Sequence, residues 1–171
     1  MDNNGDEKQK RFSIDRLCLD YRLTAKSCQM PLHEVVGARL GMQIWWKQCE
    51  SYPGDEAFAA CMVLPDGVEL VQIFTGMKSK YGLKVDWTYN HEVAHIALGH
   101  CEQKKLVYGP LTDPHEREAS WFAFSALVSV GENCLEIQKV MDELGVTQSL
   151  GSPFAGLGFF QEYGRVIEMM R

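Results

Sequence analysis

The sequence has no apolar run long enough to cross a membrane, which takes about 20 residues. It also has no internal repeat, no low-complexity block and no linker that would separate two domains. The first twelve residues (1–12) are too polar for a signal peptide and are expected to form a disordered tail. Because 46% of the chain is hydrophobic, we expect residues 13–171 to form a single domain around one core.

Positive charge and paired cysteines are scarce as well. The formal net charge of −6 argues against direct binding of nucleic acid. The cysteines form no Cys-x-x-Cys pair of the kind that holds a metal or a redox disulfide. Without a secretory segment, they are expected to remain reduced thiols in the cytoplasm. They are Cys18, Cys28, Cys49, Cys61, Cys101 and Cys134.

The most informative stretch is residues 91–95, which read His-Glu-Val-Ala-His. Four residues turn a helix through about 400°, so His91 and His95 would lie on one face, about 6 Å apart. Two imidazole nitrogens on that face can both reach one Zn²⁺ ion. Glu92 leaves the helix about 100° further round, where it could meet a water held by the metal. The spacing therefore predicts a zincin arrangement, with two ligands and a general base.

The residues around this motif predict a helix over 87–99, with Asp86 as the N-cap and Gly99 as the C-terminal stop. Apart from the motif, the segment has little polar surface, which indicates a buried helix. Burying two histidines and a glutamate without partners would be costly, and this favours a metal site. The alternative is that these are hydrogen-bonded core residues of an ordinary helix.

A third protein ligand must come from elsewhere in the chain. One zincin class uses a histidine six residues after the second, but Cys101 stands there, and the required glycine is displaced by one residue to Gly99. His100 is one residue too early, and we expect it to be a cation favoured by the helix dipole. A Cys101–His100 nucleophilic pair is disfavoured, because no separate base and orienting group can be identified.

The other zincin class takes a glutamate from a second helix. Asp113 and Pro114 predict such a helix, as N-cap and first helical residue, and a core-like apolar run follows. Glu116 lies 21 residues beyond the second histidine and is the expected ligand. Its alternative role is that of a capping-box carboxylate at the third helical position. Glu118 is the fallback ligand, although a side chain two residues on points to a different face.

Two stretches of the chain resemble motifs of the ImmA/IrrE family of metallopeptidases: His91-Glu-Val-Ala-His95-Ile-Ala-Leu-Gly-His100 and Glu116-Arg-Glu-Ala-Ser-Trp-Phe-Ala123. Members typically carry an HExxH helix and, downstream, a Glu-x-x-Ala-(Asn/Asp)-x-Phe-Ala helix, whose first glutamate corresponds to Glu116. The resemblance covers mainly residues 85–128, within an expected motif core of 85–130. The chain departs from the pattern at Ser120, where the family usually has Asn or Asp.

The resemblance implies a zinc-dependent endopeptidase in which His91, His95 and Glu116 hold the metal. Attack of a metal-bound water on a peptide carbonyl would be assisted by Glu92, which passes the proton to the leaving amine. The implied substrate is a specific protein, such as a helix-turn-helix transcriptional repressor that is encoded nearby as a separate protein. Donors to the oxyanion are expected nearby in the sequence, and the candidates are His100, Tyr108 and His115.

Two other functions fit the same residues. One is a zinc-stabilised protein that binds a regulator without cutting it, and the other is a metallohydrolase acting on a small amide. Glu92 argues against the first, because a structural zinc site needs no base and usually closes all four positions with protein ligands. Nitrogen and carboxylate ligands could also hold Mn²⁺ or Fe²⁺.

The expected fold is α+β: one zincin-like domain, mostly helical, with a small antiparallel β-sheet packed against the HExxH helix. Adjacent strand residues face opposite ways, so one of Trp45 and Trp46 is expected in the core and the other at the surface. His33 is expected at the surface, near a helix end. Further helices are predicted over 13–25, 31–40, 133–145 and 161–169, an extended segment over 42–46, and a β-hairpin over 58–74 with its turn at 65–67.

Overall fold

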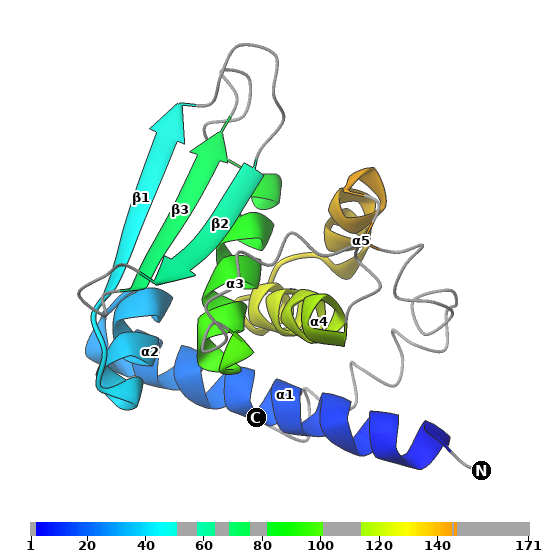
Figure 1. Cartoon of the computed structure of the whole chain (residues 1–171). Helices are drawn as coiled ribbons and strands as arrows, with labels where there is room; N and C mark the ends of the chain where they lie inside the picture. Colours follow the sequence, from blue (N-terminus) through cyan, green and yellow to red (C-terminus); the bar gives the residue numbers. More distant parts are fainter. Residues whose placement is uncertain are drawn as a thin grey trace.

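The computed structural model describes residues 3–50, 58–63, 69–75, 82–100, 114–144 and 146. Over these residues the chain is mostly helical (Figure 1). No helix in these ranges is both long and apolar enough to cross a membrane. The helices are α1 (Asn3–Cys28), α2 (Leu32–Leu40), α3 (Leu83–Ala97), α4 (Pro114–Ser129) and α5 (Cys134–Glu143), and the strands are β1 (Ile44–Glu50), β2 (Phe58–Val63) and β3 (Glu69–Thr75).

The three strands pair in the order β1-β3-β2. β2 and β3 run antiparallel, with Phe58 opposite Phe74, and the predicted turn between them lies outside the described residues. β1 pairs with β3 in parallel, with Ile44 opposite Glu69. The expectation of an antiparallel sheet is therefore corrected to a mixed one. The chain reverses direction at β2 and again at β3, so β3 runs the same way as β1 and takes the place between the two edge strands.

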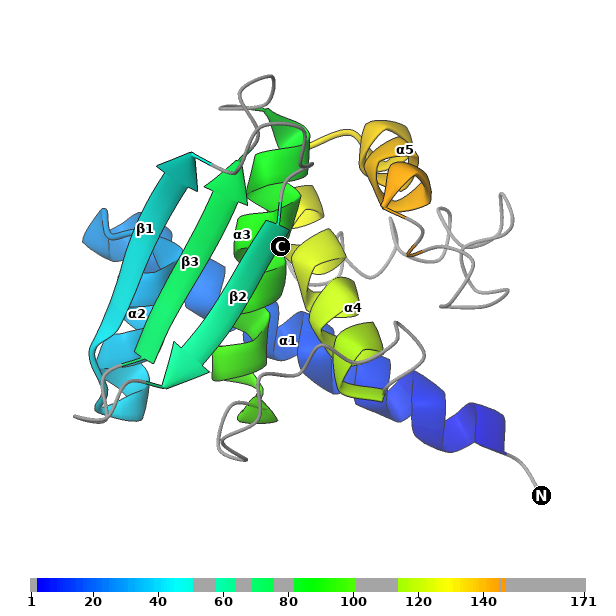
Figure 2. The ribbon, with the colours of Figure 1, turned by 45° about the horizontal axis from the view of Figure 1, so that its top comes forward.

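α3 lies between the sheet and α4 (Figures 1 and 2). It contacts β2 and β3 on one side and α4 on the other, while α1 crosses below and contacts both α4 and α2. Val93 and Ala94 of α3 and Phe122 and Ala123 of α4 are completely buried. The small alanine side chains let the two helix backbones come close together. This α3–α4 contact is what brings the two sequence motifs side by side.

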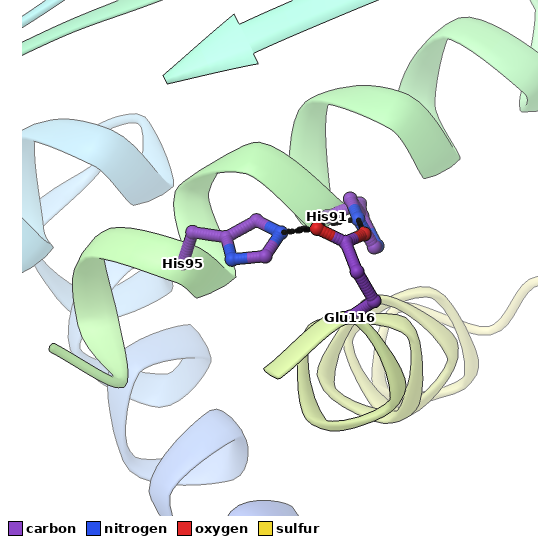
Figure 3. A group of neighbouring side chains, drawn as sticks. All are labelled: His91, His95 and Glu116. Carbon is purple, nitrogen blue, oxygen red and sulfur yellow. Dashed lines mark hydrogen bonds and ion pairs between the residues drawn. The ribbon is translucent and has the colours of Figure 1, made fainter. Parts of the chain in front are cut away.

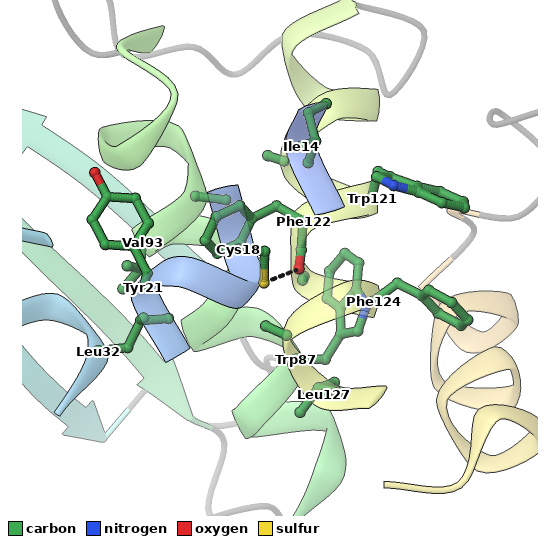
Figure 4. Packing of buried hydrophobic residues seen from close by; sticks show 14 of the residues in the cluster. Ile14, Cys18, Tyr21, Leu32, Trp87, Val93, Trp121, Phe122, Phe124 and Leu127 are labelled. Atoms are coloured by element: carbon green, nitrogen blue, oxygen red, sulfur yellow. Dashed lines mark hydrogen bonds between the residues drawn. The ribbon is translucent and has the colours of Figure 1, made fainter. Parts of the chain in front are cut away.

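α1 joins the core through one face only. Cys18 is completely buried, and its thiol donates a hydrogen bond to the carbonyl oxygen of Phe122, with 3.7 Å between sulfur and oxygen (Figure 4). Burial raises the pKa of this thiol well above its usual range. Asp15 is also buried and accepts hydrogen bonds from the Trp121 indole, at 2.8 Å, and from the Ser125 hydroxyl. Both contacts fix α1 against α4.

The expectation of a disordered tail at residues 1–12 is wrong for residues 3–12, which form the first part of α1. Two of the charged side chains in this stretch reach α4. Lys10 forms an ion pair with Glu118, and the Arg11 guanidinium carbon lies 5.4 Å from the centre of the Trp121 ring. A polar composition alone does not reveal such partners, because they lie more than 100 residues further along the chain.

The helices predicted over 31–40 and 133–145 are confirmed as α2 and α5, and the expected end of the second, Gly145, lies outside the described residues. α2 follows Pro31 and ends at Gly41, whose φ of 70° is the left-handed conformation that glycine adopts without strain. α5 follows Asn133, whose side chain accepts hydrogen bonds from the backbone nitrogens of Leu135 and Glu136. The last predicted helix, at residues 161–169, lies outside the described residues.

The HExxH helix starts earlier than predicted. Gly82 is the N-cap, and Asp86 lies in the first turn, so the prediction of Asp86 as N-cap is wrong. The helix extends toward its N-terminus because Val85, which is buried, continues its apolar face. A carboxylate in the first turn still favours the helix through its dipole. The predicted stop is confirmed, since the helix ends at Ala97 and Gly99 has a φ of 76°.

Two side-chain predictions near β1 are wrong. His33 is buried rather than at the surface, and its Nδ1 atom lies 2.8 Å from the hydroxyl of Tyr89 on α3. Trp45 and Trp46 are both largely exposed, at 53% and 43%. β1 is an edge strand, and the Trp46 ring contacts the Tyr89 ring, with 5.8 Å between the ring centres, instead of entering the core.

Candidate metal centre

Three side chains converge where α3 meets α4 (Figure 3). His91 and His95 stand one turn apart on α3, and their Nε2 atoms are 3.2 Å apart. Glu116 reaches them from the first turn of α4, with one carboxylate oxygen 3.0 Å from His91 Nε2 and the other 3.4 Å from His95 Nε2. All three are buried. The residues predicted as ligands therefore form one group, called here the His-Glu cluster, which could hold a metal ion.

The spacing of the donor atoms fits a shared cation. A tetrahedral ion with bonds of about 2.0–2.2 Å places neighbouring ligand atoms about 3.3 Å apart. The separations of 3.0, 3.2 and 3.4 Å in the His-Glu cluster lie around that value. Two imidazole nitrogens aimed at one point are poor partners for each other, because two lone pairs repel. A cation between them satisfies both nitrogens together with the carboxylate.

Glu116 presents its charged form to the cluster. Burial alone would raise the pKa of Glu116, but hydrogen bonds and charge from His91 and His95 outweigh burial and lower the pKa to about 2. The side chain is therefore a carboxylate at neutral pH, which is the form that binds metals. Both oxygens face the imidazole pair, whereas the expected N-cap of the helix, Asp113, lies outside the described residues.

The outer nitrogen of His91 is held by α4. The Ser120 hydroxyl, which is buried, lies 3.3 Å from His91 Nδ1, so the serine does reach the histidine from the position where the ImmA/IrrE pattern has Asn or Asp. The Trp87 ring stacks on the imidazole of His91, with ring centres 4.9 Å apart and planes inclined by 22°. The hydrogen bond and the stacking together fix the ring with Nε2 facing the cluster.

The outer nitrogen of His95 is held differently. His95 Nδ1 lies 3.0 Å from His100 Nδ1, and His100 Nε2 lies 3.0 Å from a carboxylate oxygen of Glu118. Glu118 in turn pairs with Lys10 of α1. His100 is buried, and burial is the main reason that its pKa falls to about 4. The expectation that His100 is a cation at the helix end is therefore wrong, because the buried ring is neutral at pH 7.

The fallback ligand does not join the cluster. The oxygens of Glu118 face His100 and Lys10, away from the metal position. Burial would raise the pKa of Glu118, but hydrogen bonds from Lys10 and His100 lower it. As a candidate oxyanion donor, His100 is already engaged through both of its nitrogens. His115 stacks on His100 with 4.3 Å between ring centres, and Tyr108 lies outside the described residues.

Glu92 follows His91 on α3 and is half-buried. Helix geometry directs it about 100° away from His91, so it leaves the helix on a different face from the two imidazoles. Its assignment as the general base stays a prediction.

Sequence reasoning missed Trp87 and His100 as residues that support the two histidines. Trp87 gave no signal beyond its place in an apolar helix. For His100 the sequence does hold a signal, which is the glycine directly before it. Gly99 has a φ of 76° and turns the chain back at the end of α3, and this turn places the His100 ring beside His95. A histidine directly after a helix-ending glycine is thus within reach of the helix's last turn.

The site is a histidine–glutamate centre built by two packed helices. No family model matches the chain, and no curated protein or solved structure is significantly similar to it.

Proposed function

We propose that this chain is a zinc-dependent endopeptidase of the ImmA/IrrE type, with a zincin-like domain around α3 and α4. The observation that carries the proposal is the convergence of His91, His95 and Glu116, whose donor atoms all lie within 4.8 Å of one another. The support of the two outer imidazole nitrogens adds to it, because a histidine held through Nδ1 aims its Nε2 lone pair at the shared position.

Zinc is the proposed occupant, because two imidazoles and one carboxylate form a ligand set found in catalytic zinc sites, which keep one position open. When bound, zinc would polarise a peptide carbonyl and lower the pKa of water toward about 7. The same ligands could hold Mn²⁺ or Fe²⁺. Metal analysis of protein purified without added ions distinguishes these.

Glu92 is proposed as the general base. Its carboxylate would take a proton from the water whose oxygen forms a bond to the carbonyl carbon of the substrate. As the bond between that carbon and the amide nitrogen breaks, the same carboxyl group would deliver the proton to the leaving amine. Glu92 is suited to this exchange because it is half-buried next to His91, while the His-Glu cluster itself is buried.

A protein is the proposed substrate, and within that class a helix-turn-helix repressor, as the resemblance implies. The net charge of −6 is compatible with a basic DNA-binding partner. We also propose that the enzyme acts in the cytoplasm, where such a regulator would be met.

Cleavage of candidate repressors tests the proposal directly. The zinc-loaded protein is incubated with purified helix-turn-helix repressors, and fragment masses are read with and without a chelator. One cut that is lost with the chelator and with Glu92→Gln supports a peptidase. Stable binding without fragments would favour a non-cleaving regulator-binding protein, and turnover of small amides alone would favour a metallohydrolase of another kind.

A further inference from the structure

A chain of polar contacts leads from His95 away from the metal position. It passes from His95 Nδ1 to His100 Nδ1, from His100 Nε2 to Glu118, and from Glu118 to Lys10, so that it links α3, the turn after it, α4 and α1. His95 and His100 are both buried, whereas Lys10 reaches solvent. The apolar core also joins α3 and α4, through buried side chains such as Val93 and Phe122.

The protons along this chain can be placed by elimination. His95 must offer the Nε2 lone pair to a metal, so its hydrogen is on Nδ1 and is donated to His100 Nδ1. His100 then carries its own hydrogen on Nε2 and donates it to Glu118, which accepts as a carboxylate. Every donor meets an acceptor in this arrangement. The reverse arrangement would put a hydrogen on His95 Nε2 and block metal binding.

We propose that His100 and Glu118 are positioning residues for the metal ligand His95. His100 holds His95 in the tautomer that exposes Nε2, and the carboxylate of Glu118 holds His100 in the matching tautomer and makes the distal imidazole a better acceptor. The inference rests on the metal site of the proposed function. It adds that the affinity of this site depends on residues that do not touch the metal.

The two histidine ligands differ in their support. His91 Nδ1 lies 3.3 Å from a neutral hydroxyl, whereas His95 Nδ1 lies 3.0 Å from an imidazole whose other nitrogen contacts a carboxylate. The Glu118 carboxylate polarises the His100 ring through a charge-assisted hydrogen bond, and this makes His100 Nδ1 a stronger acceptor than a neutral hydroxyl. The contact to His100 should therefore contribute more to metal affinity than the contact to Ser120.

A matched pair of variants separates the hydrogen bond from packing. Leu and Asn have nearly the same size, but only Asn offers an oxygen at the place of the His100 Nδ1 atom. His100→Leu should weaken zinc binding about 10–100-fold in competition with a chelator, and His100→Asn should stay within about threefold of wild type. Equal affinity in both variants and in wild type would overturn the proposal.

Glu118→Gln extends the test to the next member of the chain. It should weaken zinc binding several-fold, whereas Glu136→Gln, which removes an exposed glutamate paired with Lys139, should leave zinc binding unchanged. An identical effect of both changes would mean that only overall charge matters, which also overturns the proposal.

Wild-type protein labelled with ¹⁵N in its histidines gives a readout that needs no variant. In the zinc-loaded protein, the imidazole shifts should report hydrogen on Nδ1 of His95 and on Nε2 of His100. Hydrogen on Nδ1 of His100 would overturn the inference. Failure of wild type to bind any divalent metal would remove the site and both proposals. If the His100 and Glu118 variants showed the expected losses of zinc affinity but the wild type cleaved no protein, only the peptidase proposal would be overturned.

Discussion

His95 and His100 face each other through their Nδ1 atoms, 3.0 Å apart, across the end of α3. The contact leaves Nε2 of His95 directed at the His-Glu cluster, where it lies 3.2 Å from Nε2 of His91. The Nε2 atoms of the two histidines therefore face the position that could hold a metal ion, and their Nδ1 atoms face the supporting contacts. This separation makes the ligand roles and the supporting roles testable one residue at a time.

Replacement of Glu92 by glutamine should abolish cleavage and leave zinc bound. The amide keeps the size of the side chain but cannot take up a proton, and loss of a general base costs about 10²–10⁴-fold in rate. Zinc content by mass spectrometry and the rate of repressor cleavage are the two measurements. Glu143→Gln, at an exposed position of α5, is the matched control and should change neither. Loss of zinc along with activity would show that Glu92 is a ligand rather than a base.

Glu116→Ala should empty the metal site. Its carboxylate faces both imidazoles, so its removal takes away one of the three proposed ligands. We expect zinc affinity to fall by more than the roughly 10–100-fold expected for supporting residues. The measurement is a chelator competition, with thermal unfolding in the presence of chelator to check that the fold persists. Unchanged zinc occupancy would contradict the assignment of Glu116 as a metal ligand.

Ser120→Ala should also lower zinc affinity, but by less than Glu116→Ala. The change leaves His91 Nδ1 without its hydroxyl partner at 3.3 Å and adds no new group to a fully packed position. We expect zinc affinity to fall by roughly tenfold, at the lower end of the range for supporting residues. Isothermal titration at fixed pH measures it. A loss as large as that of Glu116→Ala would contradict the supporting role.

The candidate site could be predicted from the sequence because its signals are local. The spacing of His91 and His95 fixes their common face, and the helix-start signal at Pro114 places Glu116 in a first turn. What could not be predicted is that His100 and Glu118 support His95. Those contacts depend on the packing of α1 against α4 and on the turn at Gly99, and neither has a periodic pattern in the sequence.

Contacts between distant segments also explain why parts of the predicted fold are wrong. The hairpin at 58–74 has local turn residues, so its antiparallel pairing was predictable, whereas the parallel pairing of β1 with β3 joins segments with another strand between them. The polar residues at the start of α1 predict a solvated tail, whereas residues from Asn3 onward are helical. Their partners, such as Glu118 for Lys10, become visible only when α4 is in place.

Acid should destabilise the metal-free protein in a defined pH range. Burial lowers the pKa of His100 from 6.5 to about 4, so between these values the unfolded chain binds a proton that the folded chain does not. The free energy of unfolding should therefore fall as pH falls from about 6.5 to about 4. His100→Asn removes this group and should make the decline shallower. Urea unfolding with chelator at several pH values measures the free energy of unfolding of wild type and of the variant. If this free energy fell equally with pH in the two proteins, His100 would not be the group responsible.

Asp15→Ala tests whether α1 holds α4 in place. The buried carboxylate accepts from the Trp121 indole and the Ser125 hydroxyl, so its removal leaves two buried donors without their acceptor. We expect a loss of about 2–4 kcal/mol in the free energy of unfolding, measured in urea. Asp20→Ala, at an exposed position of the same helix, should cost less than about 0.5 kcal/mol. Because Glu116 and Glu118 stand on α4, zinc affinity should also fall in the Asp15 variant. If stability fell while zinc affinity stayed the same, α1 would support the fold without setting the geometry of the metal centre.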